Sequence, residues 1–257
     1  MNTDRHAAGT FCWAELVVHD VARAKDFYSQ MFGWTYLESA LPDGSIYARA
    51  QIRGRDVGAM QQLQAREGDR TRWSLYVEVP DVDAAAAAVI AHKGAVISQP
   101  IEAMRYGRMA VCRDPGGSTF SLWQSREHTG FEVMDEHGAP CWFELASHDL
   151  TVASPFYAAV LGWNLKPSRN GDRPYLEAFV GDKNVGGMLL IDPAWGEIPT
   201  HWSHYLQVDD TRQSVALARS LGAKILVEPK LVARVGTMAT LRDPQGGKIN
   251  LITFEKR

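Results

Sequence analysis

The sequence predicts an α+β protein that contains two copies of one domain, each assembled from two β-α-β-β-β modules. The pattern Trp-x-Glu-Leu-x-x-His-Asp-x-x-x-Ala-x-x-Phe-Tyr-x-x-x-x-Gly-Trp runs from Trp13 to Trp34 and again from Trp142 to Trp163. The offset of 129 residues is about half of the 257-residue chain. A repeat of this length indicates a duplicated domain.

Each copy divides again, because its two predicted helices begin 61 residues apart, at Asp20 and Asp81 and again at Asp149 and Asp210. Aspartate is a favourable N-cap, and apolar residues at helical spacing follow Asp20. Gly33 then provides a C-cap that tolerates left-handed backbone. Four helices of this kind are therefore expected.

Short strands separated by turn residues follow each helix, for example residues 47–52 and 56–63 in the first module. The Asp114-Pro115-Gly116-Gly117 turn precedes the last strand of the first copy. Pro155 stands inside a predicted helix, where it removes a backbone hydrogen bond. We therefore expect this helix to be kinked or to start later, with Ser154 as the N-cap.

The predicted domains cover residues 9–125 and 138–257, with a polar linker at 126–137. Each copy is long enough to bury a core of its own. The formal net charge of −3 and the lack of a basic stripe argue against a nucleic-acid partner. No apolar run predicts a membrane helix, and the polar N-terminus lacks a signal-peptide core.

The three cysteines form no CxxC pair, which favours a reduced, cytoplasmic protein. Cys12 and Cys141 occupy equivalent positions in the two copies. Free cysteines are commonly buried, so we expect these two to pack in the core.

Four such modules, with the ordered motifs Phe27-Tyr28…Gly33-Trp34, Gly94-Ala95 and Asp114-Pro115-Gly116-Gly117, resemble the vicinal oxygen chelate superfamily. This superfamily includes glyoxalase I, bleomycin-resistance proteins and extradiol dioxygenases. The resemblance covers almost the whole chain and is closest to tandem glyoxalase-like proteins of the culture-filtrate-antigen type. It implies that each pair of modules forms a U-shaped, half-open sheet around a cup that holds ligand or metal.

The resemblance also implies positions for metal ligands, early in the first strand and late in the last strand of each module. On this chain they are occupied by Trp13, Ser74, Ser121, Trp142, Ser203 and Asn250, with the remaining positions near Met60 or Gln61 and near Met188 or Leu189. Tryptophan offers no suitable lone pair, and neutral serine or asparagine oxygens are weak ligands. We therefore expect both cups to lack metal and any other cofactor.

Alternation along the strands predicts which other side chains face the cups. In the first copy these are Trp13, Glu15, Arg72, Ser74, Tyr76, Ser121 and Trp123, and in the second they are Trp142, Glu144, His201, Ser203, Tyr205, Lys248 and Asn250. Aromatic walls with a few convergent polar groups are typical of small-molecule pockets.

The two glutamates admit more than one interpretation. A carboxylate partly removed from water beside an indole can serve as a general base or as a polar anchor. Alternatively, Glu15 forms an ion pair with Arg72 or a hydrogen bond with Tyr76. In the second copy, Glu144, His201 and Tyr205 together could move a proton, so we expect the second cup to be the occupied one.

Three functions remain open on the sequence. The leading one is metal-independent binding of a small organic molecule. The second is proton abstraction or isomerisation alpha to a carbonyl, with Glu144 as base and His201 or Tyr205 as acid. The third is a metal-dependent lyase or dioxygenase with atypical ligands such as Glu144 and His201. Because two fused copies can replace the dimerisation of single-domain relatives, a monomer or a homodimer is expected.

Overall fold

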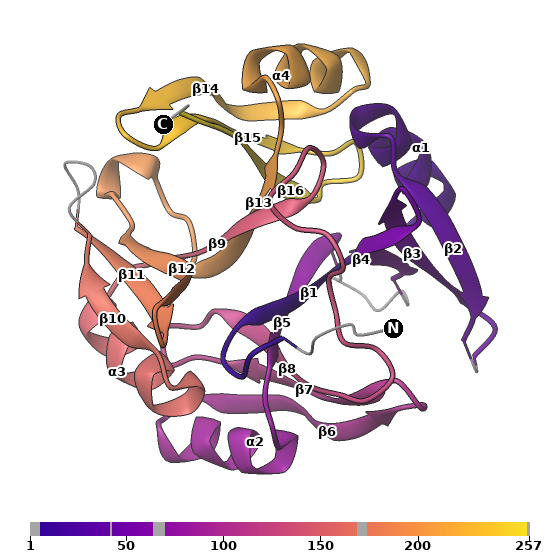
Figure 1. The fold of residues 1–257 in the computed structure, drawn as a ribbon. Helices are drawn as coiled ribbons and strands as arrows, with labels where there is room; N and C mark the ends of the chain where they lie inside the picture. The colour runs from indigo at the N-terminus through magenta and orange to yellow at the C-terminus, as the bar shows by residue number, and fades with distance from the viewer. Residues whose placement is uncertain (1–5, 42, 64–69, 169–173, 256–257) are drawn as a thin grey trace. The chain divides into compact units, whose positions relative to one another are not determined.

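The computed structural model describes residues 6–41, 43–63, 70–168 and 174–255. The first copy forms an eight-stranded sheet in the order β2-β3-β4-β1-β5-β8-β7-β6, and the second copy forms another in the equivalent order β10-β11-β12-β9-β13-β16-β15-β14. Each sheet therefore joins four strands of one module to four strands of the next (Figure 1). The predicted α+β fold of two tandem domains is confirmed.

The strands and helices follow the predicted order. The first sheet contains β1 (Phe11–Val18), β2 (Thr35–Ala40), β3 (Ile46–Ile52), β4 (Arg55–Gln62), β5 (Arg72–Glu78), β6 (Ala95–Ala103), β7 (Gly107–Arg113) and β8 (Thr119–Ser125). The second contains β9 (Pro140–Ser147), β10 (Asn164–Pro167), β11 (Tyr175–Val180), β12 (Lys183–Leu190), β13 (His201–Gln207), β14 (Lys224–Val232), β15 (Gly236–Arg242) and β16 (Lys248–Phe254). The α-helices are α1 (Val21–Phe32), α2 (Val82–Ala91), α3 (Leu150–Leu161) and α4 (Thr211–Ser220), and Pro193–Trp195 forms a short 3₁₀ helix.

The predicted helix caps are present. The Asp20 side chain accepts a hydrogen bond from the backbone N–H of Arg23, and Gly33 ends α1 in the left-handed region at φ 68°. Asp81, Asp149 and Asp210 cap the other three helices in the same way. Each carboxylate satisfies N–H groups that the first helical turn leaves without a partner.

Pro155 does not delay the start of α3, so the expected later start with Ser154 as the N-cap is wrong. The helix begins at Leu150 with Asp149 as its N-cap, and Pro155 lies inside it. The Asp149 carboxylate accepts from the N–H groups of Thr151 and Val152, which stabilises the start ahead of the proline. Pro155 is exposed, so its ring does not disturb the buried face of the helix.

The chain forms two compact units that do not follow the sequence repeats. Unit 1 comprises Met1–Trp13, Leu75–Gly130 and Phe143–Ser203, and unit 2 comprises Ala14–Ser74, Phe131–Trp142 and His204–Arg257. Helices α2 and α3 lie in contact in unit 1, and α1 and α4 do so in unit 2 (Figure 1). Each unit therefore combines one module from each repeat.

The core of unit 2 shows how the modules pack. Phe27 and Tyr28 of α1 are buried together with Leu206 of β13 and Val215 of α4. Two residues near the predicted linker, Val133 and Ala139, join the same core. The apolar stripe predicted for α1 therefore packs against a module that follows almost 200 residues later in the chain.

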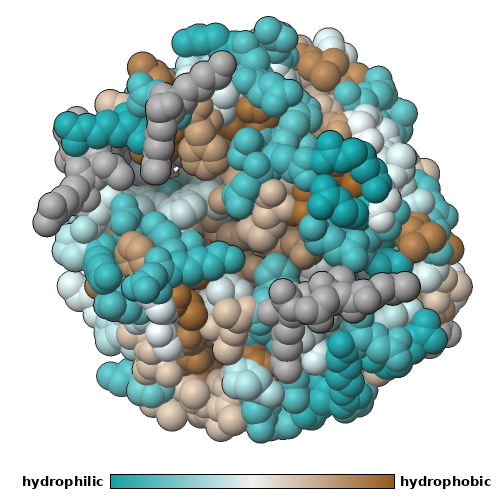
Figure 2. Space-filling view, viewed as in Figure 1, coloured by the Kyte–Doolittle hydropathy of each residue, from teal (hydrophilic) through white to brown (hydrophobic). Residues whose placement is uncertain are grey.

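Exposed hydrophobic side chains are scattered among hydrophilic ones on the face shown in Figure 2. The sheet-edge strands β6 and β14 carry several of them, but these strands also contain Pro100 and Pro229 and irregular registers. Proline and bulges at an edge oppose pairing with another chain. Among the described residues, no helix is long and apolar enough to cross a membrane.

Candidate functional site

A tyrosine donates a hydrogen bond to the predicted glutamate in each repeat. In unit 2 the Tyr47 hydroxyl lies 3.1 Å from Glu15 Oε2, and in unit 1 the Tyr175 hydroxyl lies 3.1 Å from Glu144 Oε2. We did not predict these tyrosines from the sequence. Their separation of 128 residues, close to the repeat offset, is the signal that could have identified them.

Strand register explains the pairing. Glu144 lies opposite Gly187 of β12, and Tyr175 of β11 lies opposite Leu189 of the same strand. A Cβ atom on Gly187 would lie 2.0 Å from the Tyr175 hydroxyl oxygen, so only glycine leaves room for this ring. The tyrosine therefore reaches across β12 to Glu144 over the surface of a residue without a side chain.

The alternative ion pair between Glu15 and Arg72 is not formed. Arg72 is exposed, and its Nη1 donates to the carbonyl oxygen of Arg70 at 3.5 Å. No ion pair joins it to Glu15 among the residues with described positions. Ser74 lies half-buried on the same strand, and its predicted role in ligand binding remains a prediction.

An aromatic cluster occupies unit 1 at the first repeat. Tyr76 of β5 pairs in register with Ser121 of β8, and the ring of Tyr76 lies 6.3 Å from that of Trp123 at 89°. The ring of His128, from the segment after β8, lies 4.4 Å from the ring of Trp13 and 5.9 Å from the ring of Trp123. Trp13 is only 3% exposed and Trp123 is 6% exposed, so these predicted wall residues are packed against protein.

The second repeat places its equivalent residues in unit 2. Tyr205 pairs in register with Asn250, and the Asn250 amide is used internally. Its Oδ1 accepts from the Thr240 hydroxyl at 2.8 Å, and its Nδ2 donates to the His204 carbonyl oxygen at 3.2 Å. Trp142 and Lys248 are half-buried.

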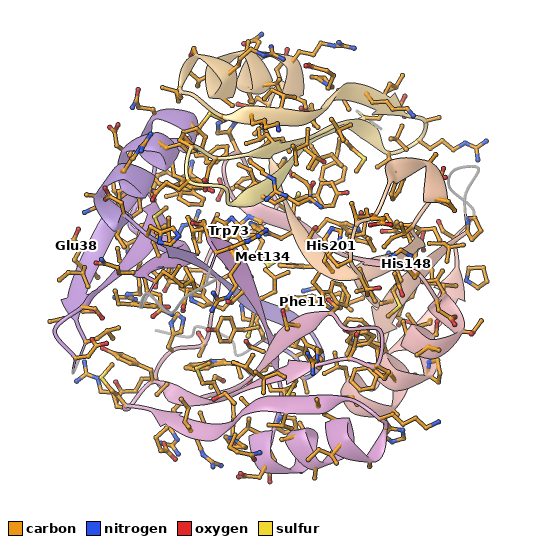
Figure 3. All side chains as sticks on the ribbon, turned by 180° about the vertical axis from the view of Figure 1, so that it is seen from behind. Phe11, Glu38, Trp73, Met134, His148 and His201 are labelled. Atoms are coloured by element: carbon orange, nitrogen blue, oxygen red, sulfur yellow. The ribbon has the colours of Figure 1, made fainter. Side chains whose placement is uncertain are left out.

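His201 and Ser203 lie on β13 in unit 1 and are half-buried (Figure 3 labels His201). His201 Nδ1 lies 2.7 Å from the carbonyl oxygen of Pro199. A carbonyl oxygen only accepts, so Nδ1 carries the proton and the lone pair of the neutral ring is on Nε2. The structure places Glu144 in the same compact unit as His201 and places Tyr205 in the other.

The residues at the family's metal-ligand positions do not fit a divalent ion. Trp13 and Trp142 have no side-chain atom that can coordinate a metal ion. Both polar atoms of the Asn250 amide form hydrogen bonds within the sheet. At the remaining family positions, Met60 and Met188 are fully buried. Gln61 lies on the same face of the sheet as Glu15, because each is next in sequence to one member of the register pair Leu16 and Met60. Within the described part of the chain, no group of three or more His, Cys, Asp or Glu residues could hold an ion.

Buried polar contacts connect the motifs that the resemblance rests on. The Tyr28 hydroxyl donates to Asp243 Oδ2 at 2.9 Å, and the Tyr157 hydroxyl donates to Asp114 Oδ2 at the same distance. Each contact joins a helix tyrosine of one repeat to the Asp-Pro turn of the other. Burial raises the pKa of both aspartates, and backbone N–H groups of the turns partly oppose that rise.

The three cysteines are buried, as predicted for Cys12 and Cys141. The thiols of Cys12 and Cys141 donate to the carbonyl oxygens of Tyr76 and Tyr205 at 3.5 Å and 3.4 Å. Burial raises the pKa of the Cys141 thiol. A thiol held protonated in this way is a poor nucleophile.

Comparison with family models matches both repeats. Residues 10–122 match the glyoxalase/bleomycin resistance protein/dioxygenase superfamily, and residues 142–252 match a glyoxalase-like domain. The chain belongs to this superfamily. The superfamily membership agrees with the resemblance seen in the helix and turn motifs.

Two relatives of this superfamily member align over almost their whole length. The protein CFP32 of Mycobacterium tuberculosis, provisionally named a glyoxylase, is 33% identical over 248 residues, which covers 95% of this chain and 94% of CFP32. The anthracycline biosynthesis protein DnrV of Streptomyces peucetius is 30% identical over 267 residues, covering 98% and 96% of the two chains.

Solved structures of the superfamily share the fold at low sequence identity. The Mn(II)-bound glyoxalase from Novosphingobium aromaticivorans aligns with a TM-score of 0.65 at 18% identity, covering 96% of this chain and 82% of that one. The 2,3-dioxygenase LapB from Pseudomonas sp. KL28 also aligns with a TM-score of 0.65, at 14% identity, covering 98% and 94%.

Proposed function

We propose that this chain binds a small organic molecule on its second repeat, without a metal ion, and that Glu144 is the polar anchor. The observation that carries the proposal is a difference in exposure between the repeats. Trp13 and Glu15 on β1 are 3% and 5% exposed, whereas Trp142 and Glu144 on β9 are half-buried. Trp142 and Glu144 are therefore more accessible than Trp13 and Glu15, which makes the second repeat the better candidate.

Glu144 has the chemistry of an anchor. An ionised carboxylate can accept about four hydrogen bonds, and the Tyr175 hydroxyl provides one of them. A carboxylate suits a hydroxyl or amine of a ligand, and the indole of Trp142, on the same strand, suits a flat apolar ring. The other side chains proposed to bind ligand in the second repeat are His201, Ser203, Tyr205, Lys248 and Asn250.

Two residues of the first repeat, Trp13 and Glu15, are more buried than their counterparts in the second. The residues predicted from the sequence to face the first cup are Trp13, Glu15, Arg72, Ser74, Tyr76, Ser121 and Trp123. Trp13 and Trp123 pack closely around His128, which supports a structural role for the first-repeat residues. We therefore expect one ligand per chain.

Absence of a metal is part of the proposal and rests on the donor set. Tryptophan, serine and an amide already used in the sheet provide no ligand comparable with imidazole or carboxylate. Elemental analysis of the purified protein for Zn, Mn, Fe and Ni tests this directly. One equivalent of any of these ions, retained after dialysis, would overturn the metal-free assignment.

The relatives named for anthracycline biosynthesis suggest the first ligands to try, which are planar aromatic compounds with carbonyl and hydroxyl groups. Binding is measured by isothermal titration and by tryptophan fluorescence. Glu144→Gln should weaken binding about tenfold or more, because a charged hydrogen bond contributes about 1.5–3 kcal/mol. Glu15→Gln is the matched control, since it makes the same change in the other repeat and should leave affinity unchanged. Equal effects of the two substitutions would contradict the proposed site.

A second candidate function is proton abstraction alpha to a carbonyl. It is supported by the Tyr175 hydroxyl, which orients the Glu144 carboxylate. In the neutral Nδ1 tautomer His201 has a lone pair on Nε2, so it acts as the acid there only when the ring is protonated. Exchange of the alpha proton of a bound ketone with deuterated solvent would detect it by NMR. Glu144→Gln should abolish the exchange at saturating ligand, and exchange at the wild-type rate in that variant would exclude Glu144 as the base.

A further inference from the structure

We propose that the ligand of the second repeat carries a primary ammonium group and that Glu177 is the residue that selects it. Glu177 lies on β11, is half-buried and belongs to unit 1, as Glu144 does. This ligand class rests on the function proposed for the second repeat, because the ammonium group would bind beside the Glu144 anchor.

Strand register places Glu177 and Glu144 in one row across the sheet. Gly187 of β12 lies opposite Glu144 on one side and opposite Glu177 on the other. Residues in register point to the same face of a sheet, and so do residues two apart on one strand. Both carboxylates are therefore on the face from which Tyr175 reaches Glu144. The Cα atoms of the two glutamates are two strand spacings apart, which is about 10 Å.

The Tyr175 hydroxyl adds a third oxygen to this row. It lies over Gly187, because a Cβ atom on that glycine would collide with it. The hydroxyl donates to Glu144 Oε2 at 3.1 Å, and a phenol oxygen that donates its proton can also accept a hydrogen bond. A primary ammonium group has three N–H donors. The row of Glu144, Tyr175 and Glu177 therefore offers one oxygen acceptor for each N–H.

The chain positions Glu177 without pairing it with a cation. Its Oε1 accepts a hydrogen bond from the Ser168 hydroxyl at 2.7 Å. Lys166 of β10 lies opposite Glu177 in register, but its Nζ lies 4.6 Å from the centroid of the Phe179 ring. Among the residues that the structure describes, no ion pair includes Glu177. A cation that pairs with this carboxylate is therefore expected to come from a ligand.

The first repeat has the opposite charge at the corresponding position. Ala59 lies opposite Glu15 on one side and opposite Arg49 on the other, so Arg49 corresponds to Glu177 by register. Arg49 forms an ion pair with the buried Asp56. The first row therefore contains a cation of its own, whereas the second places two carboxylates on one face, where they repel each other. A bound ammonium group would remove that repulsion.

The test compares three anthraquinones that differ in one substituent, which is aminomethyl, hydroxymethyl or carboxylate. All three are planar aromatic ketones, and at neutral pH their substituents are positive, uncharged and negative. Binding to wild type, Glu177→Gln and Glu177→Arg is measured by tryptophan fluorescence and isothermal titration. Glu228→Gln is the matched control, because it makes the same change in net charge at an exposed position of β14.

We expect wild type to bind the aminomethyl compound about tenfold more tightly than the hydroxymethyl compound, and the carboxylate most weakly. Glu177→Gln should weaken binding of the aminomethyl compound about tenfold and change binding of the hydroxymethyl compound less than about twofold. Glu177→Arg, which copies the charge of the first repeat, should make the carboxylate the tightest of the three. Glu228→Gln should leave the wild-type order unchanged.

Glu144→Gln separates failure of this inference from failure of the proposed site. If binding of the hydroxymethyl compound depends on Glu144 but wild type shows no preference for the aminomethyl compound, the ammonium assignment is wrong and the site stands. If binding of the hydroxymethyl compound is unaffected by Glu144→Gln, the proposed site itself is wrong. A preference for the aminomethyl compound that survives Glu177→Gln, or no binding of that compound to wild type, would overturn the selection by Glu177.

Discussion

Two buried tyrosines form hydrogen bonds that connect one repeat to the other. Tyr28 donates to Asp243, and Tyr157 donates to Asp114, in both cases between a helix of one repeat and a turn of the other. The two sites differ in one respect, because the indole N–H of Trp202 donates to the Tyr157 hydroxyl at 2.6 Å. The corresponding N–H of Trp73 also interacts with Tyr28 and lowers the pKa of its hydroxyl, but this contact is weaker, because the N–H forms no close hydrogen bond within the described part of the chain.

This difference predicts the order of two substitutions. Tyr28→Phe removes one hydrogen bond to a buried carboxylate and should lower the free energy of unfolding by about 1.5–3 kcal/mol. Tyr157→Phe removes the same bond and also leaves the Trp202 N–H unpaired, so its loss should be greater by about 1 kcal/mol or more. Urea unfolding of the two variants beside wild type measures both. A larger loss for Tyr28→Phe would contradict this account of the networks.

His204 is a second residue whose effect follows from burial. It is fully buried, and its ring packs 4.6 Å from that of Trp73 at 63°. Desolvation lowers the pKa of His204 to about 3. The residue at the equivalent position in the first repeat is Leu75.

His204 should therefore make the protein less stable in mild acid. Above pH 6.5 the ring is neutral in both states, and below it the unfolded chain takes up a proton that the folded chain refuses. From pH 7 to pH 5 this should lower the free energy of unfolding by about 2 kcal/mol. His204→Leu, which copies the other repeat, should remove that part of the pH dependence. Urea titrations at both pH values give the comparison, and parallel curves for variant and wild type would show that His204 is not responsible.

At the level of elements, α3 shows that a strong cap outweighs an internal proline. Asp149 satisfies two N–H groups of the first turn, and the helix continues through Pro155 to Leu161. The proline leaves the carbonyl oxygen of Thr151 without its usual partner, but Thr151 is exposed and water can replace the missing donor.

Pro155→Ala should therefore stabilise the protein by about 1–3 kcal/mol, because it restores a helical hydrogen bond at an exposed position. The reverse change at the equivalent position of α1, Asp26→Pro, should cost about 3 kcal/mol. Thermal and urea unfolding report both changes. Destabilisation by Pro155→Ala would mean that the proline makes a contribution that the packing of α3 does not reveal.

At the level of the whole molecule, the sequence repeats and the compact units divide the chain differently. Each unit contains one helix-bearing module from each repeat, and residues 131–142 after the first domain belong to unit 2. The continuity of the chain between the repeats is therefore not what holds their modules together. The boundaries predicted for the two domains remain predictions.

Cleavage between the repeats tests this organisation. Arg126 and Glu127 are exposed, so a protease site inserted between them can be cut in the folded protein. The two fragments should stay together in native size-exclusion chromatography and separate only in denaturant, because each compact unit draws on both. Uncut protein with the same insertion is the control. Fragments that separate under native conditions would contradict the division into two compact units that each contain residues of both fragments.

Sequence reasoning reached the fold because its main signals are local. The repeat of Trp13–Trp34, the aspartate caps and the left-handed Gly33 depend on backbone geometry and on hydrogen bonds within a few residues. Such interactions form in the same way wherever the module lies. They therefore identified the four helices, the strands that follow them and the residues of each repeat that match the superfamily.

Contacts between distant residues could not be obtained in this way. Tyr28 and Asp243 are 215 residues apart, and nothing in the periodicity of either segment specifies that they meet. The Tyr175–Glu144 pair depends on the register of three strands, and the closure of the first aromatic cluster depends on the course of the chain after β8. The amino-acid sequence alone determined the modules, because their caps and periodicities are local. The tertiary structure alone decided which modules pack together and which glutamate remains accessible, because packing and register bring those residues together across the chain.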